Sequence, residues 1–295
     1  MDTRFLETFL AVVEGGSISE AARRLHLTPA GVTQRLRALE GEIGAALLAR
    51  TGRGVAPTPA GLRIAERARP LLHGLRDLSA GLEEGVLAGE LRLGAVTTAA
   101  IGLLPDLLVS LRASHPGIDV RLQPGRSSEL YAAILDAALD AALIAQPPFG
   151  VPKSCGWMDV RIEPMVLLVP ESLAGEEPMA LLSTQPFIRY DERSWGGKLA
   201  GDYLRRRRIR PREIFELETL DAIAVLVDRG LGISIVPDWA PPWPSGLSLA
   251  KLPLPDAPSR SIGLVWQRAS PRVALIDALR GDIATLSGRE GDGRP

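Results

Sequence analysis

Residues 17–40, SISEAARRLHLTPAGVTQRLRALE, constrain the fold more than any other stretch, because they carry two short helical patterns separated by a turn. The first pattern places small and branched apolar residues on one helical face, namely Ile18, Ala21, Ala22 and Leu25. The two adjacent alanines let a second helix cross closely, whereas leucines would hold the two axes apart. The stretch therefore predicts a tightly packed helix-turn-helix.

The second helix has a start signal and two different faces. Thr28 and Pro29 predict its start, because a threonine oxygen accepts from free N–H groups and the φ of proline suits the first helical position. A buried stripe follows at Val32, Leu36 and Leu39. The opposite face carries small or hydrogen-bonding groups of the kinds that contact bases or phosphates, namely Ala30, Thr33, Gln34 and Arg37. A merely solvated face would look the same, so both interpretations stay open here.

The next segment favours the nucleic-acid interpretation. Residues 40–53, EGEIGAALLARTGR, and residues 54–61, GVAPTPAG, predict a helix end, a short turn and a return segment. Arg50 and Arg53 flank the glycine-bearing tip, and arginines there suit insertion beside a minor groove. This layout predicts a wing.

The run from Glu14 to Gly61 resembles the winged helix-turn-helix of LysR-type transcriptional regulators. The resemblance implies that the recognition helix carries Thr28, Pro29, Ala30, Thr33, Gln34 and Arg37, and that the wing carries Arg53. Members of that family often have glutamine or serine where this chain has Pro29. Because proline offers no donor, the resemblance implies only an apolar contact at that position.

Composition bounds the class of protein. The chain has 295 residues, enough for about two domains, with 46% hydrophobic residues and a net charge of −1. A net charge this close to zero predicts a local basic face and not a basic domain. The arginines that would form this face are Arg23, Arg24, Arg35, Arg37, Arg50 and Arg53. No apolar run approaches the roughly 20 residues of a membrane span, and residues 1–16 resemble an amphipathic helix instead of a signal peptide. We therefore expect a cytoplasmic protein.

Thr58 and Pro59 predict the start of a long helix that reaches about Glu84. Along it, apolar and small residues recur at spacings of three and four, namely Ala65, Ala68, Leu72, Leu75, Ser79 and Leu82. This seam predicts pairing with the same helix of a second copy, and packing on its own domain is the alternative. In LysR-type regulators the corresponding linker helix pairs two DNA-binding domains, which implies a homodimer, or a homotetramer, on an interrupted palindrome.

After a glycine-containing break at residues 85–90, strands and helices alternate. Residues 91–96 and 118–122 read as strands around a helix at 101–111, which favours a parallel sheet with helices on both faces. Thr97 and Thr98 follow the first strand, and Ser127 and Ser128 follow the second. Ligands bind beyond the carboxyl ends of such strands, so these hydroxyls are predicted to face one cleft, with simple helix capping as the alternative.

A second lobe begins at Met165–Val169, with another strand at residues 187–188. The polar and aromatic cluster that follows, FIRYDERSWGG, predicts a binding loop with Arg189, Tyr190 and Ser194, or else a salt-bridged surface turn. The run Arg205–Arg208 is interpreted as a solvated helix face. Residues 219–228 predict a helix, 232–236 and 262–266 predict strands, and 271–286 predict a closing helix.

This half resembles the effector-binding domain of LysR-type regulators, itself similar to periplasmic solute-binding proteins, through LRLGAVTTAAIGLLPDLL, HPGIDV and LVDRGLGISIVPDW. The segment ALDAAL at residues 138–143 departs from the usual glycine-bearing version. The resemblance implies an α+β multidomain chain: a winged helix-turn-helix at 1–60, a linker helix and hinge at 61–89, and an effector domain at 90–295. Lobe I is expected at 90–163 and 267–295, and lobe II at 164–266. The cleft residues would include Thr97, Thr98, Ser127, Ser128 and Tyr190.

The expected function is DNA-binding transcriptional regulation by a chain that responds to a small-molecule effector. Double-stranded DNA, a second copy, the effector and RNA polymerase are the expected partners, with no membrane, no metal and no other cofactor. A solute-binding module without DNA activity is the alternative. An enzyme is a third hypothesis, but His26, His73 and His115 lack metal-ligand spacing with Cys155, and no catalytic nucleophile motif is present. Cys155 is the single cysteine, which excludes an intrachain disulfide and favours a structural role.

Overall fold

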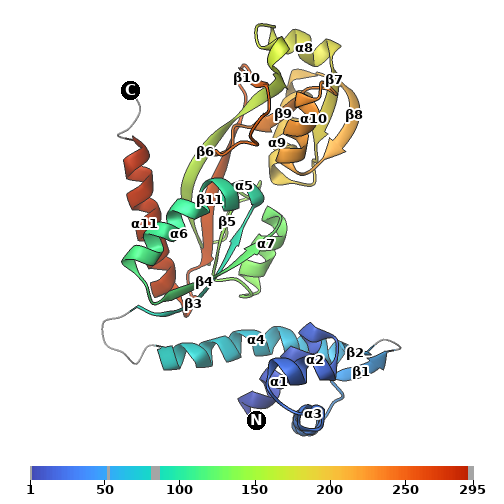
Figure 1. The fold of residues 1–295 in the computed structure, drawn as a ribbon, viewed down its shortest axis with the longest axis vertical. Coiled ribbons are helices and arrows are strands. Elements are labelled where there is room, and N and C mark those ends of the chain that lie inside the picture. Colours follow the sequence, from blue (N-terminus) through green and yellow to red (C-terminus); the bar gives the residue numbers. More distant parts are fainter. Residues whose placement is uncertain (1, 52–53, 81–86, 292–295) are drawn as a thin grey trace. The chain divides into compact units, whose positions relative to one another are not determined.

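The computed structural model describes residues 2–51, 54–80 and 87–291, which form two compact units, residues 1–85 and 86–295 (Figure 1). Three sequence-based predictions lie outside the described residues: Arg53 on the wing, Leu82 in the seam and the end of the linker helix near Glu84. The side chains of Leu75 and Ser79 are also outside the description.

Unit 1 consists of helices and one β-hairpin: α1 (Thr3–Gly15), α2 (Ile18–Arg24), α3 (Pro29–Ile43), β1 (Leu48–Thr51), β2 (Gly54–Pro57) and α4 (Pro59–Ala80). Side-chain caps set the helix starts, as predicted for Thr28, whose Oγ1 accepts from the N–H of Gly31 at 3.1 Å. Ser17 caps α2 in the same way, and Gly44 ends α3 in the left-handed conformation at φ +74°. Local sequence therefore determines where these helices begin and end.

The predicted buried stripe of α3 is confirmed, since Val32, Leu36 and Leu39 all lie in the core of unit 1. Ala21 and Ala22 are also buried, which permits the close crossing of α2 and α3.

The predicted dimer seam was wrong for its described half. Ala65, Ala68 and Leu72 are buried in the core of unit 1, where α4 packs on α1. Spacings of three and four mark any helix with one buried face, so the pattern alone does not distinguish a partner helix in the same unit from one in a second copy.

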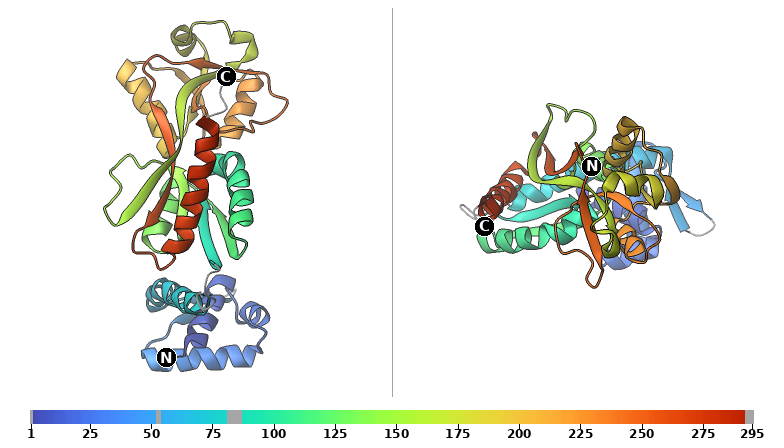
Figure 2. Two further views of the ribbon diagram at one scale, coloured as in Figure 1. Left: turned by 90° about the vertical axis from the view of Figure 1, so that its left-hand side faces the viewer. Right: turned by 90° about the horizontal axis from the view of Figure 1, so that it is seen from above.

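Unit 2 alternates strands and helices in two lobes. Its elements are β3 (Gly89–Ala95), α5 (Thr97–Gly102), α6 (Leu104–Ser114), β4 (Ile118–Pro124), α7 (Ser127–Leu135), β5 (Ala141–Ala145), β6 (Cys155–Pro170), η1 (Glu171–Leu173), α8 (Pro178–Thr184), β7 (Pro186–Tyr190), α9 (Trp195–Arg207), β8 (Arg212–Leu217), α10 (Leu220–Asp228), β9 (Ser234–Pro237), β10 (Leu249–Pro253), β11 (Ser259–Gln267) and α11 (Val273–Gly291). We call the part around β3, β4 and β5 lobe I and the part around β7, β8, β9 and β10 lobe II. Strands β6 and β11 run between the lobes (Figure 1, Figure 2).

The main sheet has the order β10-β6-β11-β5-β3-β4, with β9 paired to β6. Strand β3 is parallel to β4 and β5, as predicted, but β11 is antiparallel to both of its neighbours. The prediction of a parallel sheet was therefore wrong for this strand, and β9 and β10 are likewise antiparallel to β6. Strand β6 leads the chain from lobe I into lobe II and β11 leads it back beside β6, so these two strands run in opposite directions.

Both faces of each lobe are covered by helices. In lobe I, α6 and α11 pack on one face of the sheet and α7 on the other (Figure 1). In lobe II, successive residues of the predicted strand at 165–169 alternate between two cores, one with α8 and α9 and one with α10. A strand covered on both faces needs a continuous apolar run, which is why this segment reads MVLLV.

A buried ionic cluster joins three segments of lobe I. The Asp140 carboxylate accepts from the Arg92 backbone N–H at 2.8 Å, from Arg92 Nη2 at 2.6 Å and from Arg272 Nη1 at 2.9 Å. Burial alone would raise the pKa of the Asp140 carboxyl, but the hydrogen bonds and charges of Arg92 and Arg272 outweigh it and lower that pKa. Asp140 belongs to the segment ALDAAL, which departs from the family pattern. Its bonds to Arg92 nevertheless hold the start of β5 beside β3.

Candidate functional site

The polar face of α3 points away from the core of unit 1. Ala30, Gln34 and Arg37 are exposed, and Thr28 and Pro29 are exposed at its start. Thr33 is half-buried, and its Oγ1 donates to the Pro29 carbonyl at 2.9 Å. Gln34 and Arg37 therefore keep the freest donors on this face.

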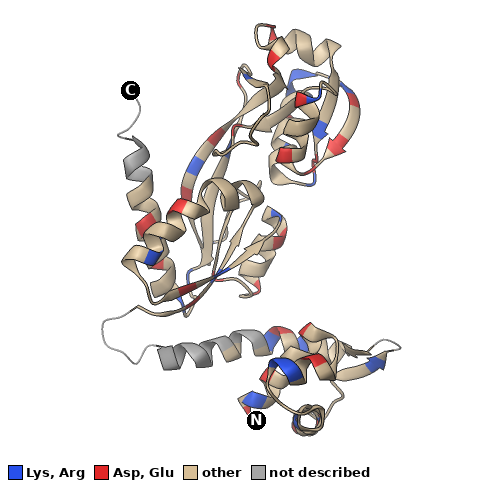
Figure 3. Cartoon of the chain, viewed as in Figure 1, with Lys and Arg blue, Asp and Glu red and all other residues tan. Residues whose placement is uncertain are grey.

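The positive charge of unit 1 is more local than the sequence suggested. Basic and acidic residues lie close together on its helices (Figure 3), and Arg23 pairs with Glu20 while Arg24 pairs with Glu14 at 2.6 Å. The Arg35 guanidinium bonds the buried Thr8 hydroxyl at 3.3 Å. Of the predicted arginines that the structure describes, Arg37 and Arg50 have no ion-pair or hydrogen-bond partner. Of these predicted arginines, the two without a partner among the described residues thus lie on α3 and on the hairpin.

The predicted wing is the antiparallel hairpin of β1 and β2, in which Arg50 is exposed and pairs in register with Val55. Gly54 lies at φ +156°, and a Cβ there would come within 2.5 Å of the Gly16 carbonyl oxygen. The N–H of Val55 donates to that same carbonyl at 3.0 Å. Glycine is therefore needed at residue 54 because the hairpin is bonded directly to the turn between α1 and α2.

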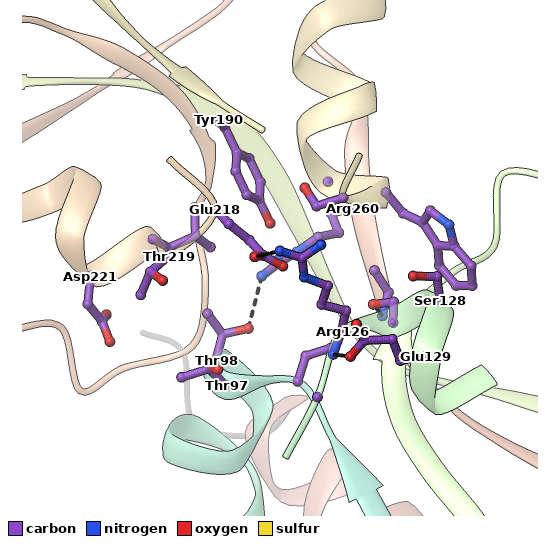
Figure 4. A pocket seen from close by; sticks show the side chains of 18 residues that line it. Thr97, Thr98, Arg126, Ser128, Glu129, Tyr190, Glu218, Thr219, Asp221 and Arg260 are labelled. Atoms are coloured by element: carbon purple, nitrogen blue, oxygen red, sulfur yellow. Dashed lines mark hydrogen bonds and ion pairs between the residues drawn. The ribbon is translucent and has the colours of Figure 1, made fainter. Parts of the chain in front are cut away.

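Unit 2 contains a pocket of about 260 Å³ lined by both lobes (Figure 4). Six residues predicted for the cleft line it, namely Thr97, Thr98, Ser127, Ser128, Tyr190 and Ser194. Arg189 does not line it. The Arg189 guanidinium pairs with Glu213 and Glu192 instead, and the bond to Glu213 raises the pKa of Arg189.

The rest of the cluster after β7 is partly a salt-bridged surface turn. Arg193 pairs with Asp191 at 2.7 Å, and that hydrogen bond holds the pKa of the Asp191 carboxyl below its usual range. The Ser194 Oγ accepts from the N–H of Gly197 at 2.9 Å, which caps α9. Arg205 pairs with Glu192 and Asp202, in agreement with the solvated helix face predicted for that run.

The hydroxyls of the pocket differ in what they bind, and two local predictions were wrong. Thr97 and Thr98 are the first residues of α5 and not a capping turn, since Val96 occupies the N-cap position. The helix predicted at 101–111 is split at Leu103 into α5 and α6.

A further error concerns the start of α7, where neither serine is the cap. The N-cap residue is Arg126, whose backbone N–H donates to Glu129 Oε2 at 3.3 Å. The Ser127 Oγ instead accepts from the N–H of Ala145 at 3.1 Å, which joins α7 to the end of β5. We expected a serine to cap α7, but the Ser127 hydroxyl is used by a different donor, the N–H of Ala145 at the end of β5.

The sequence-based reasoning missed the charged residues of the pocket: Arg126, Glu129, Glu218, Asp221 and Arg260. The Arg126 guanidinium of lobe I forms an ion pair with Glu218 of lobe II across the pocket (Figure 4). These residues are far apart along the chain, and no local pattern marks them as partners.

Beneath the pocket, the two strands between the lobes are tied by a buried ion pair. Arg260 of β11 and Glu163 of β6 are register neighbours, and Arg260 Nε donates to Glu163 Oε2 at 2.7 Å. Their side chains are only 4% and 1% exposed. Arg260 Nη2 also donates to Thr98 Oγ1 at 3.2 Å, so α5 is anchored to the same pair. Burial raises the pKa of the Glu163 carboxyl, against the opposing attraction of Arg260.

Three further features of the described residues were considered as sites. Cys155 is a buried free cysteine at the start of β6. Within residues 2–51, 54–80 and 87–291, no group of three His, Cys, Asp or Glu side chains is arranged to hold a metal ion. None of the described helices is both long and apolar enough to cross a membrane.

Comparison with family models matches almost the whole chain. Residues 3–62 match the model described as bacterial regulatory helix-turn-helix protein, lysR family. Residues 84–285 match the model described as LysR substrate binding domain.

Curated proteins match over similar lengths. A probable hydrogen peroxide-inducible genes activator of Mycobacterium leprae is 32% identical over 297 residues, covering 97% of this chain and 94% of that protein. The HTH-type transcriptional regulator GltR of Bacillus subtilis is 30% identical and covers 80% of each chain.

Solved structures share the fold. A full-length OxyR variant from Pseudomonas aeruginosa superposes with a TM-score of 0.71 at 21% identity, covering 96% of this chain and 94% of that one. Full-length CbnR, solved in complex with its target DNA, gives a TM-score of 0.69 at 24% identity, covering 96% of this chain and 100% of that one.

Proposed function

Because the chain belongs to the LysR family of DNA-binding transcriptional regulators, we propose that it reads its operator with α3 and the hairpin and responds to a small molecule in the pocket of unit 2. A solute-binding module without DNA activity is the weaker alternative, because residues 3–62 match the regulatory helix-turn-helix model. We also propose that the activity is regulatory and not catalytic, and that the protein acts in the cytoplasm, where its DNA is.

Different roles follow from the chemistry of the exposed residues of unit 1. Gln34 is uncharged and exposed, so we assign it to base edges, where an amide can donate and accept at once. Arg37 and Arg50 are exposed and have no ion-pair partner among the described residues, so we assign them to phosphates. Thr28, Pro29, Ala30 and Thr33 complete the proposed contact face, with Arg53 as a further proposed wing contact outside the described residues.

We further propose that the protein acts as a homodimer, or as a homotetramer, because one recognition helix reads only half of a palindrome. The described half of the predicted seam is covered by α1, so a contact between copies does not use Ala65, Ala68 or Leu72. Leu71 of α4 is 60% exposed and supplies apolar surface for this contact. Contact with RNA polymerase at the promoter remains part of this proposal.

The effector role rests on one observation, the ion pair of Arg126 and Glu218 that joins the two lobes across the pocket. A small molecule that binds there contacts both lobes at once. It can shift the lobes only if it binds one arrangement more tightly than the other. Thr97, Thr98, Ser127, Ser128, Tyr190 and Ser194 are the proposed effector residues, and Arg189 is withdrawn from this set because it pairs outside the pocket.

Genome-wide capture of bound DNA at a stated salt concentration tests the regulator. We expect enrichment of a short interrupted palindrome near one or a few promoters. A folded protein that enriches no such site would contradict operator binding under those conditions.

Two variants on the operator so found test the residue assignments. Arg37→Ala should weaken binding to all sequences and reduce the slope of log K against log salt by about 0.9 for each phosphate that is no longer neutralised. Gln34→Ala should leave that slope unchanged and relax base preference. Arg63→Ala is the matched control, because Arg63 is equally exposed but lies on α4. Equal effects of Arg37→Ala and Arg63→Ala would remove the assignment of Arg37.

A further inference from the structure

Opposite charges of the two lobes neutralise one another inside the pocket (Figure 4). Arg126 stands at the start of α7 in lobe I, and Glu218 stands just before α10 in lobe II. Their side chains are 42% and 33% exposed, so water still reaches both. Both residues line the cavity, which means that a bound molecule would lie against this pair.

Further charged side chains line the pocket around this pair. On the lobe II side, Asp221 also lines the pocket and has no hydrogen-bond or ion-pair partner among the described residues. On the lobe I side, Glu129 accepts from the backbone N–H of Arg126, which leaves the guanidinium as the group that reaches into the pocket. The second arginine of the pocket, Arg260, is already held by the buried Glu163. Among the described residues that line the pocket, Arg126 is thus the cation without a buried partner, and carboxylates lie on both lobes, Glu218 and Asp221 in lobe II and Glu129 in lobe I.

A ligand that binds between Arg126 and Glu218 must supply each of them with a new partner. An anion would bind the Arg126 guanidinium and leave the Glu218 carboxylate without its partner. A cation would bind Glu218 and leave Arg126 without its partner. A charged group that a bound ligand shields from water without pairing it is unfavourable, although the partial exposure of both side chains reduces this penalty. A molecule that carries both charges leaves neither residue unpaired.

Building on the effector role proposed above, we propose that the effector is a small zwitterion of the α-amino acid type. Its carboxylate binds the Arg126 guanidinium, and its ammonium group binds the Glu218 carboxylate, with Asp221 beside it. The hydroxyls of Thr97, Ser128 and Tyr190, which have no partners among the described residues, remain available to orient it.

The size of the pocket agrees with this class of ligand. A cavity of about 260 Å³ lies below the roughly 300–1,000 Å³ typical for drug-sized molecules. The pocket therefore fits a small metabolite. Its mixed charges also disfavour a purely apolar ligand, which would leave the charged groups desolvated.

Binding of three matched sets of compounds to the full chain tests the inference. The sets are the standard α-amino acids, the same molecules without the amino group, and the same molecules without the carboxylate. Isothermal titration calorimetry at one pH and salt concentration gives Kd for each. We expect at least one amino acid to bind about 10-fold or more tightly than both of its matched analogues.

Two variants at the pair give a crossed pattern that a merely structural role would not produce. Glu218→Gln should weaken binding of the amino acid about 10-fold and strengthen binding of the analogue without the amino group, because Arg126 is then free for it. Arg126→Gln should weaken the amino acid similarly and favour the analogue without the carboxylate. Glu216→Gln is the matched control, since Glu216 is exposed on β8 and outside the pocket lining.

Three results would overturn the zwitterion: no amino acid binds, a singly charged analogue binds as tightly as its amino acid, or Glu218→Gln behaves like Glu216→Gln. The effector role is judged separately, by whether pocket variants such as Thr98→Ala change the promoter response in cells. A promoter response that depends on the pocket, together with selective binding of a singly charged analogue, would retain the effector role and remove only the zwitterion.

Discussion

Neutralising Asp140 should destabilise unit 2 strongly, because its charge holds two arginines inside lobe I. Asp140 and Arg272 are each 3% exposed, and Arg92 is 13% exposed. Asp140→Asn keeps the shape but removes the charge and turns one acceptor into a donor that faces a guanidinium. Breaking a buried ion pair on one side costs about 3–5 kcal/mol. We expect a cost at the lower end, about 3 kcal/mol, since Arg272 has a further interaction and Arg92 is partly solvated.

Tryptophan fluorescence during urea unfolding measures this change in unit 2 alone. The chain has five tryptophans, and all of them lie in unit 2: Trp157, Trp195, Trp239, Trp243 and Trp266. Asp238→Asn is the matched control, because Asp238 pairs with Lys251 at the surface and such pairs contribute at most about 1 kcal/mol. Protein concentration is held constant, since assembly would add to the apparent stability.

The pH dependence of the same measurement has a definite sign. The pKa of the Asp140 carboxyl is lowered in the folded chain, so its contribution is present above the unfolded pKa of about 3.9 and is lost as pH falls through the lower folded pKa. The gap between wild type and Asp140→Asn should therefore stay constant from about pH 8 to pH 5 and narrow below about pH 4. A loss no larger than that of Asp238→Asn, or a gap that widens on acidification, would refute this reasoning.

Two further predictions follow from single contacts. Thr98→Ala should reduce the promoter response to the effector while operator binding persists, and Thr98→Ser should restore the response because its hydroxyl can still accept from Arg260; a normal response in Thr98→Ala would leave Thr98 with a structural role only. Gly61→Ala should destabilise unit 1 by about 1–3 kcal/mol, because its Cβ would come within 2.1 Å of the Leu47 carbonyl oxygen. Far-ultraviolet circular dichroism of thermal unfolding checks it, and an unchanged midpoint would contradict it.

Local signals in the sequence were sufficient for most of unit 1. The cap at Thr28, the proline after it and the stripe at Val32, Leu36 and Leu39 are all short-range features, and the structure confirms them. The seam along α4 was assigned to a second copy because helical spacing shows only that one face of the helix is buried. It does not show which element covers that face. The partner, α1, lies more than forty residues earlier in the chain.

The predicted pocket residues lie at the end of a strand or soon after it. Six of them line the pocket, because strand ends mark the edge of a sheet, namely Thr97, Thr98, Ser127, Ser128, Tyr190 and Ser194. Arg126 and Glu218 were not found, since their partnership exists only after the lobes come together. Arg189 was misplaced because side chains along a strand alternate in direction, and nothing local shows which of two neighbours faces the ligand.

The order of the sheet has a consequence for biosynthesis. Strand β11 is the last strand along the described chain, yet it lies in the middle of the sheet between β6 and β5. Until residues 259–267 leave the ribosome, β5 and β6 each present an unpaired edge, and such edges pair readily with other chains. Lobe I therefore cannot be completed before these residues emerge, whereas the strands of lobe II pair with one another without β11. A nascent chain stalled before residue 259 should therefore depend on chaperones far more than one stalled after residue 267.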